Sequence, residues 1–198
     1  MKKRMNKIVL ILMMTISVMS YANSMYAVKT TKTNTVLTLN NVKKGNKLII
    51  KDTNLLVLYR ESIKENGTYK KGFDLTALPD GNYYFELDKD VEIIMIPFKV
   101  VSNTVTFDKQ KESVIYKPTV RVDDNHVFVS RLSLEAEPLK IKMYYRESQN
   151  YDTSMILSEE IENTKIVERI YELSKEKTGE YTIVFESQGR SFTEKIKF

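Results

Sequence analysis

The chain has 198 residues, with 31 lysines and arginines against 26 aspartates and glutamates, and a pI of about 9.1. It contains no cysteine, which excludes a disulfide framework, a thiol nucleophile, a cysteine-ligated metal and the lipid-modified cysteine of a bacterial lipoprotein. Its six glycines form no glycine-rich phosphate-binding loop.

The first 22 residues have the layout of a secretory signal peptide. Lys2, Lys3, Arg4 and Lys7 precede an uncharged apolar run from Ile8 to Val18, which at 11 residues is too short for a membrane-spanning helix of ~20. Cleavage is expected after Ala22, or alternatively after Ser24. We therefore predict an exported protein, periplasmic or extracellular at the cell surface, with no membrane span after cleavage.

Removal of this leader changes the charge balance. Taking its four basic residues from 31 leaves 27 against 26 acidic residues, a net charge of +1. The basicity belongs to the leader, and both signs alternate along the rest of the chain. A nucleic-acid partner is therefore not expected, since it needs basic residues concentrated on one surface.

After a polar stretch from Asn23 to about Thr33, short segments of alternating apolar residues recur every 8–12 residues or so, which is typical of an all-β sandwich or barrel. The expected strands of the first half are Thr35–Leu39, Lys47–Lys51, Leu55–Tyr59, Asn82–Leu87, Val91–Val101 and Thr104–Phe107. Those of the second half are Thr119–Asp124, His126–Leu134, Leu139–Tyr145, Glu180–Glu186 and Ser191–Phe198.

One segment is ambiguous by its own pattern. Ile161, Ile166, Ile170 and Leu173 could form the apolar stripe of a helix, with charged residues between them. An internal repeat favours a strand here instead.

The repeat aligns residues 58–100 with residues 156–198 at an offset of 98 without a gap. Upstream the match resumes at an offset of 91, pairing Val36 with Val127 and Ile50 with Ile141, so the second copy has seven extra residues after Lys142. The identical pairs at offset 98 are Glu61/Glu159, Ile63/Ile161, Leu75/Leu173, Gly81/Gly179, Tyr83/Tyr181 and Lys99/Lys197.

Two copies of this size predict two like domains in tandem. We expect a first β-sandwich domain at residues 33–109, a linker at 110–118 and a second at 119–198, which repeats the first. The alternative is a single larger sandwich built from the two halves.

The turn in "FDLTALPDGNYYFEL" is repeated in "YELSKEKTGEYTIVF". We expect Pro79 and Asp80 to fill the centre of a type I turn, with Gly81 left-handed as the chain re-enters a strand. The residues assigned to this structural corner are Leu75, Pro79, Asp80, Gly81 and Tyr83, and in the second copy Leu173, Gly179 and Tyr181.

This motif resembles the "DLS-x-L-x-x-G-x-Y" signature of immunoglobulin-like β-sandwich domains in secreted Bacteroidetes proteins, which include the C-terminal sorting domains of the type IX (Por) secretion system. The resemblance implies two small antiparallel immunoglobulin-like sandwiches, export, and no activity of their own. A sorting domain usually opens with Pro-Asn-Pro, of which only Pro118 is present here. A related stand-alone exported protein therefore fits better than a type IX client.

The residues that could carry chemistry are few. His126 is the only histidine, and the chain has no G-x-S-x-G motif with a serine nucleophile for which it could act as the base. A zinc site would need further ligands of this type. Asp123 and Asp124 are adjacent, so on a strand they cannot converge as a glycosidase pair; a turn with Asn125 left-handed is expected, with a calcium site as the alternative. We expect no enzyme activity, no cofactor and no metal.

The hairpin after Lys142 is where the copies differ, and we place the candidate binding residues there: Tyr144, Tyr145, Arg146, Asn150 and Tyr151. Strand alternation puts Tyr144 and Tyr145 on opposite faces, so at least one should face solvent or a neighbour. The main hypothesis is a non-catalytic structural or protein-interaction role at the bacterial envelope or outside the cell. The alternative is a carbohydrate-binding accessory that uses this hairpin, or simply a longer hairpin with one tyrosine packed over an edge.

Overall fold

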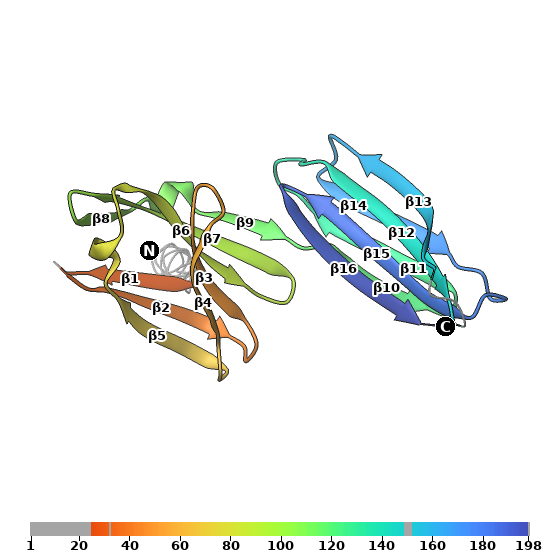
Figure 1. Cartoon of the computed structure of the whole chain (residues 1–198), viewed down its shortest axis with the longest axis horizontal. Coiled ribbons are helices and arrows are strands. Elements are labelled where there is room, and N and C mark those ends of the chain that lie inside the picture. The colour runs from red at the N-terminus through yellow and green to blue at the C-terminus, as the bar shows by residue number, and fades with distance from the viewer. Residues whose placement is uncertain (1–24, 32, 149–151, 198) are drawn as a thin grey trace, which may run out of the picture.

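The computed structural model describes residues 25–31, 33–148 and 152–197, and these are almost entirely strands (Figure 1). The predicted signal peptide and its cleavage sites lie outside the described residues. The strands form two sandwiches placed end to end along the longest axis of the molecule.

The first sandwich packs two antiparallel sheets face to face. Its elements are β1 (Tyr26–Thr30), β2 (Thr35–Val42), β3 (Lys47–Asp52), β4 (Val57–Ser62), β5 (Gly67–Phe73), the short 3₁₀ helix η1 (Leu75–Ala77), β6 (Gly81–Asp88), β7 (Glu92–Val101), β8 (Thr104–Phe107), η2 (Lys109–Lys111) and β9 (Ser113–Tyr116). One sheet has the order β1-β2-β5 and the other β4-β3-β6-β7-β8, with β9 also paired to β7.

The second sandwich repeats this pairing. Its strands are β10 (Thr119–Asp123), β11 (His126–Leu132), β12 (Leu139–Glu147), β13 (Ser154–Ile161), β14 (Ile166–Glu172), β15 (Gly179–Ser187) and β16 (Arg190–Lys197). The sheets have the orders β10-β11-β14 and β13-β12-β15-β16, so β10 to β16 take the places of β1 to β7. Three strands packed on four in this order form an immunoglobulin-like sandwich, which confirms the predicted all-β fold class.

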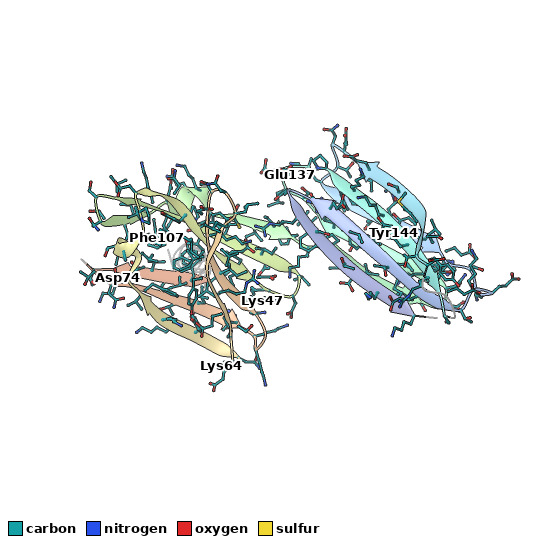
Figure 2. The ribbon with its side chains drawn as sticks, in the orientation of Figure 1. Lys47, Lys64, Asp74, Phe107, Glu137 and Tyr144 are labelled. Atoms are coloured by element: carbon teal, nitrogen blue, oxygen red, sulfur yellow. The ribbon has the colours of Figure 1, made fainter. Side chains whose placement is uncertain are left out.

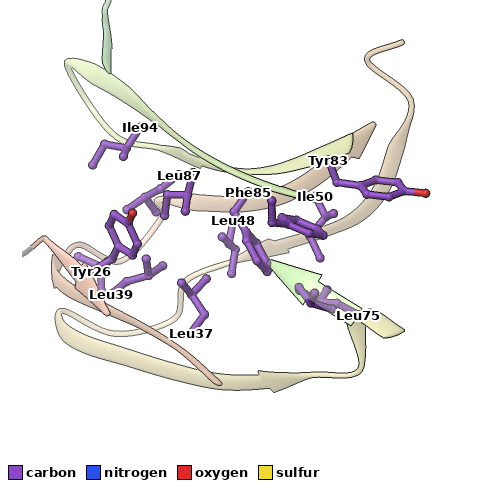
Figure 3. Packing of buried hydrophobic residues seen from close by; sticks show 14 of the residues in the cluster. Tyr26, Leu37, Leu39, Leu48, Ile50, Leu75, Tyr83, Phe85, Leu87 and Ile94 are labelled. Carbon is purple, nitrogen blue, oxygen red and sulfur yellow. The ribbon is translucent and has the colours of Figure 1, made fainter. Parts of the chain in front are cut away.

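Each sandwich has its own core, formed by alternate residues of facing strands. In the first, Leu48, Phe85 and Leu87 from one sheet meet Leu37 and Leu39 from the other, and all are at most 1% exposed (Figure 3). The second core contains Val127, Val129, Leu139, Ile141, Met143, Ile183 and Phe185.

The ambiguous segment is strand, as the repeat predicts. Ile161 ends β13, and Ile166 and Ile170 lie in β14, which pairs with β11. Val167 is buried in the core, whereas Ile166 and Ile170 are each 64% exposed. Burial in this segment therefore alternates with the period of two of a strand, not the 3.6 of a helix. Ile166 and Ile170 lie on the outer face of β14, where they are exposed to solvent.

Both ends of the first sandwich lie further out than the predicted domain bounds. Residues 26–30, read as a polar stretch, form β1, whose backbone pairs with β2. The predicted linker at 110–118 contains η2 and β9, and only Lys117 and Pro118 connect β9 to β10. Backbone pairing with a neighbouring strand supplies the stabilisation that the side-chain pattern of these short segments does not signal.

The predicted alignment of the two copies is wrong at the β3–β4 hairpin. Ile50 pairs with Tyr59, nine positions on, and Met143 pairs with Leu157, fourteen positions on, so the second hairpin is five residues longer, not seven. Met143 therefore corresponds to Ile50 in place of the predicted Ile141. A shift of two residues keeps every side chain on the same face, so the apolar pattern cannot detect it.

The repeated corner differs in detail from the predicted turn. Gly81 does not have a positive φ; it is the first residue of β6. A Cβ there would lie 3.3 Å from the Tyr83 ring, and a Cβ on Gly179 would lie 2.3 Å from the carbonyl oxygen of Arg146. Gly179 therefore needs glycine for close approach of the backbone, and Gly81 has a tight contact with the Tyr83 ring; neither is needed for a left-handed conformation.

Tyr83 closes this corner. Its ring is buried, and its hydroxyl, directed away from the core in Figure 3, donates a 2.8 Å hydrogen bond to the carbonyl of Pro79. A tyrosine bonded to backbone a few residues upstream is a recurrent corner of immunoglobulin-like sandwiches. The Tyr83 hydroxyl therefore has a structural role at this corner.

Candidate functional site

The predicted binding residues of the β12–β13 hairpin do not form one surface. Tyr144, Tyr145 and Arg146 lie in β12, whereas Asn150 and Tyr151 lie outside the described residues. Tyr144, labelled on the second sandwich in Figure 2, and Arg146 lie on the outer face of the sheet, and Tyr145 packs against the core. The prediction that the two tyrosines take opposite faces is thus confirmed.

Tyr145 is held inward by three contacts. Its ring lies 4.8 Å from the ring of Tyr181, and its hydroxyl donates a 3.1 Å hydrogen bond to the carbonyl of Thr178. The ammonium of Lys177 lies 5.3 Å from the centre of its ring, within reach of a cation–π interaction. Tyr145 is therefore partly a core residue, but its outer edge lines a groove.

On the outer face, Arg146 belongs to a charge cluster centred on Glu180. The Arg146 guanidinium lies 3.3 Å and the Lys195 ammonium 3.1 Å from the same carboxylate oxygen. The hydrogen bond from Lys195 lowers the pKa of Glu180. Arg146 is therefore already paired within its own sheet.

A groove of about 380 Å³ opens between the edge strands β13 and β14. That volume lies within the range of small ligand sites, ~300–1,000 Å³. The exposed Ile156 and Ile170 flank it, and Lys177 and Glu172 supply charge. Its lining residues are Met143, Tyr145, Ile156, Leu157, Ile170, Tyr171, Glu172, Leu173, Ser174, Lys177 and Tyr181.

The first sandwich carries larger side chains at two positions along the same edge. Tyr59 and Tyr69 occupy the positions that Leu157 and Val167 take in the second copy, and the Tyr59 ring packs edge-on against Phe73 at 5.4 Å. Lys71 lies 5.1 Å from the centre of the Tyr59 ring. The side chains along this edge therefore differ between the two copies.

An ion pair joins the two edge strands in both copies, and its acid is the repeated Glu61/Glu159. Glu61 pairs with Lys71 at 2.5 Å and accepts hydrogen bonds from Tyr59 and Tyr69, the latter at 3.0 Å. The hydrogen bonds from Lys71 and then Tyr59 lower the pKa of Glu61 to about 2. Sequence comparison of the copies identified this glutamate, but not its partner.

In the second copy Glu159 accepts from the Arg169 guanidinium at 3.3 Å and from the Tyr171 hydroxyl. Burial, followed by the hydrogen bond to Glu159, raises the pKa of Tyr171. Lys71 and Arg169 occupy equivalent positions in the two copies, and both are basic. This shared charge is the signal in the sequence that could have revealed the contact.

The acidic turn before His126 takes a different form from the prediction. Asp124, not Asn125, has the left-handed backbone, with φ of 51°, and its carboxylate pairs with Lys175. Asn125 is buried and donates a 2.9 Å hydrogen bond to the carbonyl of Leu173. Because the Asn125 side chain points inward to bond Leu173, the exposed Asp124 is the residue that adopts the left-handed turn conformation.

His126 is half-buried in β11, with its ring 6.4 Å from that of Phe128. Within residues 25–31, 33–148 and 152–197, no three histidine, aspartate or glutamate side chains converge in the manner of a metal site. In the same ranges, no helix has the length and apolar character needed to cross a membrane.

Comparisons with known proteins add little to this description. No protein-family model matches the chain, and no curated protein matches it. Among solved structures, the FN1–FN3 domains of chicken CNTN1 are 13% identical in sequence, with a TM-score of 0.26. The match covers 87% of this chain and 66% of the CNTN1 chain. A structure of the receptor tyrosine kinase Torso is 10% identical in sequence, with a TM-score of 0.25; the match covers 90% of this chain and 74% of the Torso chain. The fold assignment rests on the strand pairing, because superpositions this loose carry no argument about activity or partners.

Proposed function

We propose that this is an exported, non-catalytic tandem β-sandwich protein that binds another protein at the bacterial envelope or outside the cell. The observation that carries the proposal is the open apolar groove between β13 and β14. Exposed apolar side chains lie on the strands beside it: Met155, Ile156, Ile166 and Ile170 are between 47% and 64% exposed.

Two physical considerations support a protein partner. Contiguous exposed apolar surface on a soluble domain is typical of an interaction site. At the equivalent edge of the first sandwich the larger Tyr59 and Tyr69 side chains pack against the core, so the two copies differ in the side chains that they place there. The aromatic, lysine and isoleucine groups of the groove are suited to contact with a partner surface.

Export is tested by fractionating the cells that produce the protein and measuring the intact mass of the mature chain. A mass that corresponds to cleavage after Ala22 or Ser24, in the periplasmic or extracellular fraction, is expected. Recovery of the uncleaved chain in the cytoplasm would contradict the proposal.

The interaction is tested by placing a photo-crosslinking amino acid at Ile170 and irradiating the producing cells. We expect a discrete adduct with another protein, because Ile170 flanks the groove and is 64% exposed. Val101, which is 44% exposed on the first sandwich, is the control position and should give much less of that adduct. Equal adducts at both positions, or none at Ile170, would contradict a role for the groove.

A further inference from the structure

Glu86 is a buried carboxylate on a face of the first sandwich that should be wet. Its neighbours in β6, Phe85 and Leu87, point into the core, so strand alternation directs Glu86 outward. It is nevertheless 3% exposed. Carboxylates are seldom buried without a partner, so something outside the sheet must cover and pair with it.

The cover comes from the second sandwich. The Arg190 guanidinium donates to both Glu86 carboxylate oxygens, at 3.1 and 2.8 Å, and also lies 3.4 Å from the Met95 sulfur. Lys51 completes the site from β3 with a 3.0 Å contact to Glu86. A two-pronged guanidinium–carboxylate pair fixes orientation as well as distance, which a single-point contact does not.

The charge state of Glu86 agrees with this geometry. Burial by itself raises the pKa of the carboxyl, but the hydrogen bonds from Arg190 and Lys51 outweigh it, and the resulting pKa is below the ordinary value. Glu86 is thus held ionised between two cations, one of which belongs to the other sandwich.

Arg190 is presented by a tight hairpin. Ser187 and Arg190 are the last pair of β15 and β16, which leaves a two-residue turn of Gln188 and Gly189 with φ of 52° and 67°. Two successive positive φ values are those of the turn that matches the twist of a β-hairpin. The side chain of Arg190 is therefore supported by regular structure, not by a loose loop.

The covalent connection between the sandwiches is short. Between β9 and β10 stand only Lys117 and Pro118, and the Lys117 backbone donates a 2.9 Å hydrogen bond to the Val91 carbonyl. Such a connection limits the separation of the two bodies but leaves backbone rotations about which they can swing. Relative motion of linked domains is the default unless an interface prevents it.

We propose that Arg190 and Glu86 form a latch that fixes the angle between the two sandwiches. With the latch closed, the tandem moves as one rigid body. With it broken, the second sandwich swings about the backbone that follows Lys117, whose ammonium pairs with Asp88 of the first sandwich, while both sandwiches stay folded. This inference goes beyond the proposed function and does not depend on the groove or on its partner.

The chain's lack of cysteine permits a direct test on the full-length mature protein. Cysteines at the exposed Lys64 and Lys165, one on each sandwich, carry spin labels for pulsed dipolar distance measurement. The unmodified latch should give one narrow distribution. Arg190→Gln and, independently, Glu86→Gln should each widen it about twofold or more, as expected for freely linked domains. Arg190→Lys, which keeps the charge but not the two-pronged contact, should give an intermediate width.

Arg146→Gln is the matched control, because it removes an arginine–glutamate pair that lies within the second sandwich. It should leave the distribution unchanged. Near-ultraviolet circular dichroism from the tyrosines verifies that each variant is folded. A broad distribution with the latch intact overturns the proposal, and so does a narrow one in either folded glutamine variant.

Discussion

The hydroxyl of Tyr83 ties the corner of the first sandwich to the carbonyl of Pro79. Tyr83→Phe keeps the ring and removes only the 2.8 Å hydrogen bond to the Pro79 carbonyl. We expect the free energy of unfolding to fall by about 1 kcal/mol, the usual net value of such a bond. Urea denaturation measures it. Tyr144→Phe, in the second sandwich's sheet, is the control and should change stability by less; equal effects would contradict a special role for the corner.

The two corner glycines should differ in their tolerance of a methyl group. Gly179→Ala places a Cβ 2.3 Å from the Arg146 carbonyl oxygen, so backbone must shift, whereas Gly81→Ala meets the edge of the Tyr83 ring at 3.3 Å. We expect Gly179→Ala to cost about 1–3 kcal/mol or more, as overpacking does, and Gly81→Ala to cost less. Thermal unfolding of both variants tests this order, and the reverse order would show that the second corner can open.

Glu61 should make stability depend on pH in acid. Because Lys71 and Tyr59 lower its pKa to about 2 from 4.5, its stabilising contribution is complete above about pH 4.5 and is lost as the pH falls towards 2. Partial exposure of the pair keeps the effect modest. Glu61→Gln should flatten the dependence of the unfolding midpoint between pH 2 and 5. An unchanged slope would mean that other carboxylates control it.

At the scale of elements, the groove between β13 and β14 depends on the size of the side chain at position 157, which is a leucine. Leu157→Tyr introduces the residue that the first copy has at the equivalent position, Tyr59. We expect it to reduce the crosslinking yield from Ile170, while stability changes by less than about 1 kcal/mol, as for most partly exposed substitutions. Leu157→Met, which adds no ring, should keep the yield. An unchanged crosslinking yield in the Leu157→Tyr variant would show that binding does not depend on the groove.

Alternation of apolar residues predicted most strands, and the repeat correctly assigned β14. Apolar alternation missed β1, β5 and β9, which are recognised by their backbone pairing with β2 and β7. The repeat misplaced the registers: Val36 is half-exposed on β2, whereas Val127, its predicted equivalent, is buried. Only cross-strand partners determine register.

At the scale of the whole molecule, the latch couples the stability of the two sandwiches. Phe185→Ala removes a fully buried ring from the second core and should cost that sandwich about 3–5 kcal/mol. When the second sandwich unfolds, Glu86 loses Arg190, so amide hydrogens of β3 and β6 should also exchange faster. Hydrogen-exchange mass spectrometry measures this. Adding Arg190→Gln should abolish the coupling, and unchanged exchange in β6 would argue that the sandwiches unfold independently.

By itself the sequence determined that this chain is all-β and that it is built from two related halves. These properties follow from local periodicity and from side chains that recur at a fixed spacing. Tertiary structure alone decided that Tyr145 turns inward, that Leu157 leaves an edge open, and that Arg190 covers Glu86. The last of these contacts joins residues 104 positions apart, and all three depend on register and docking geometry, which no local pattern encodes.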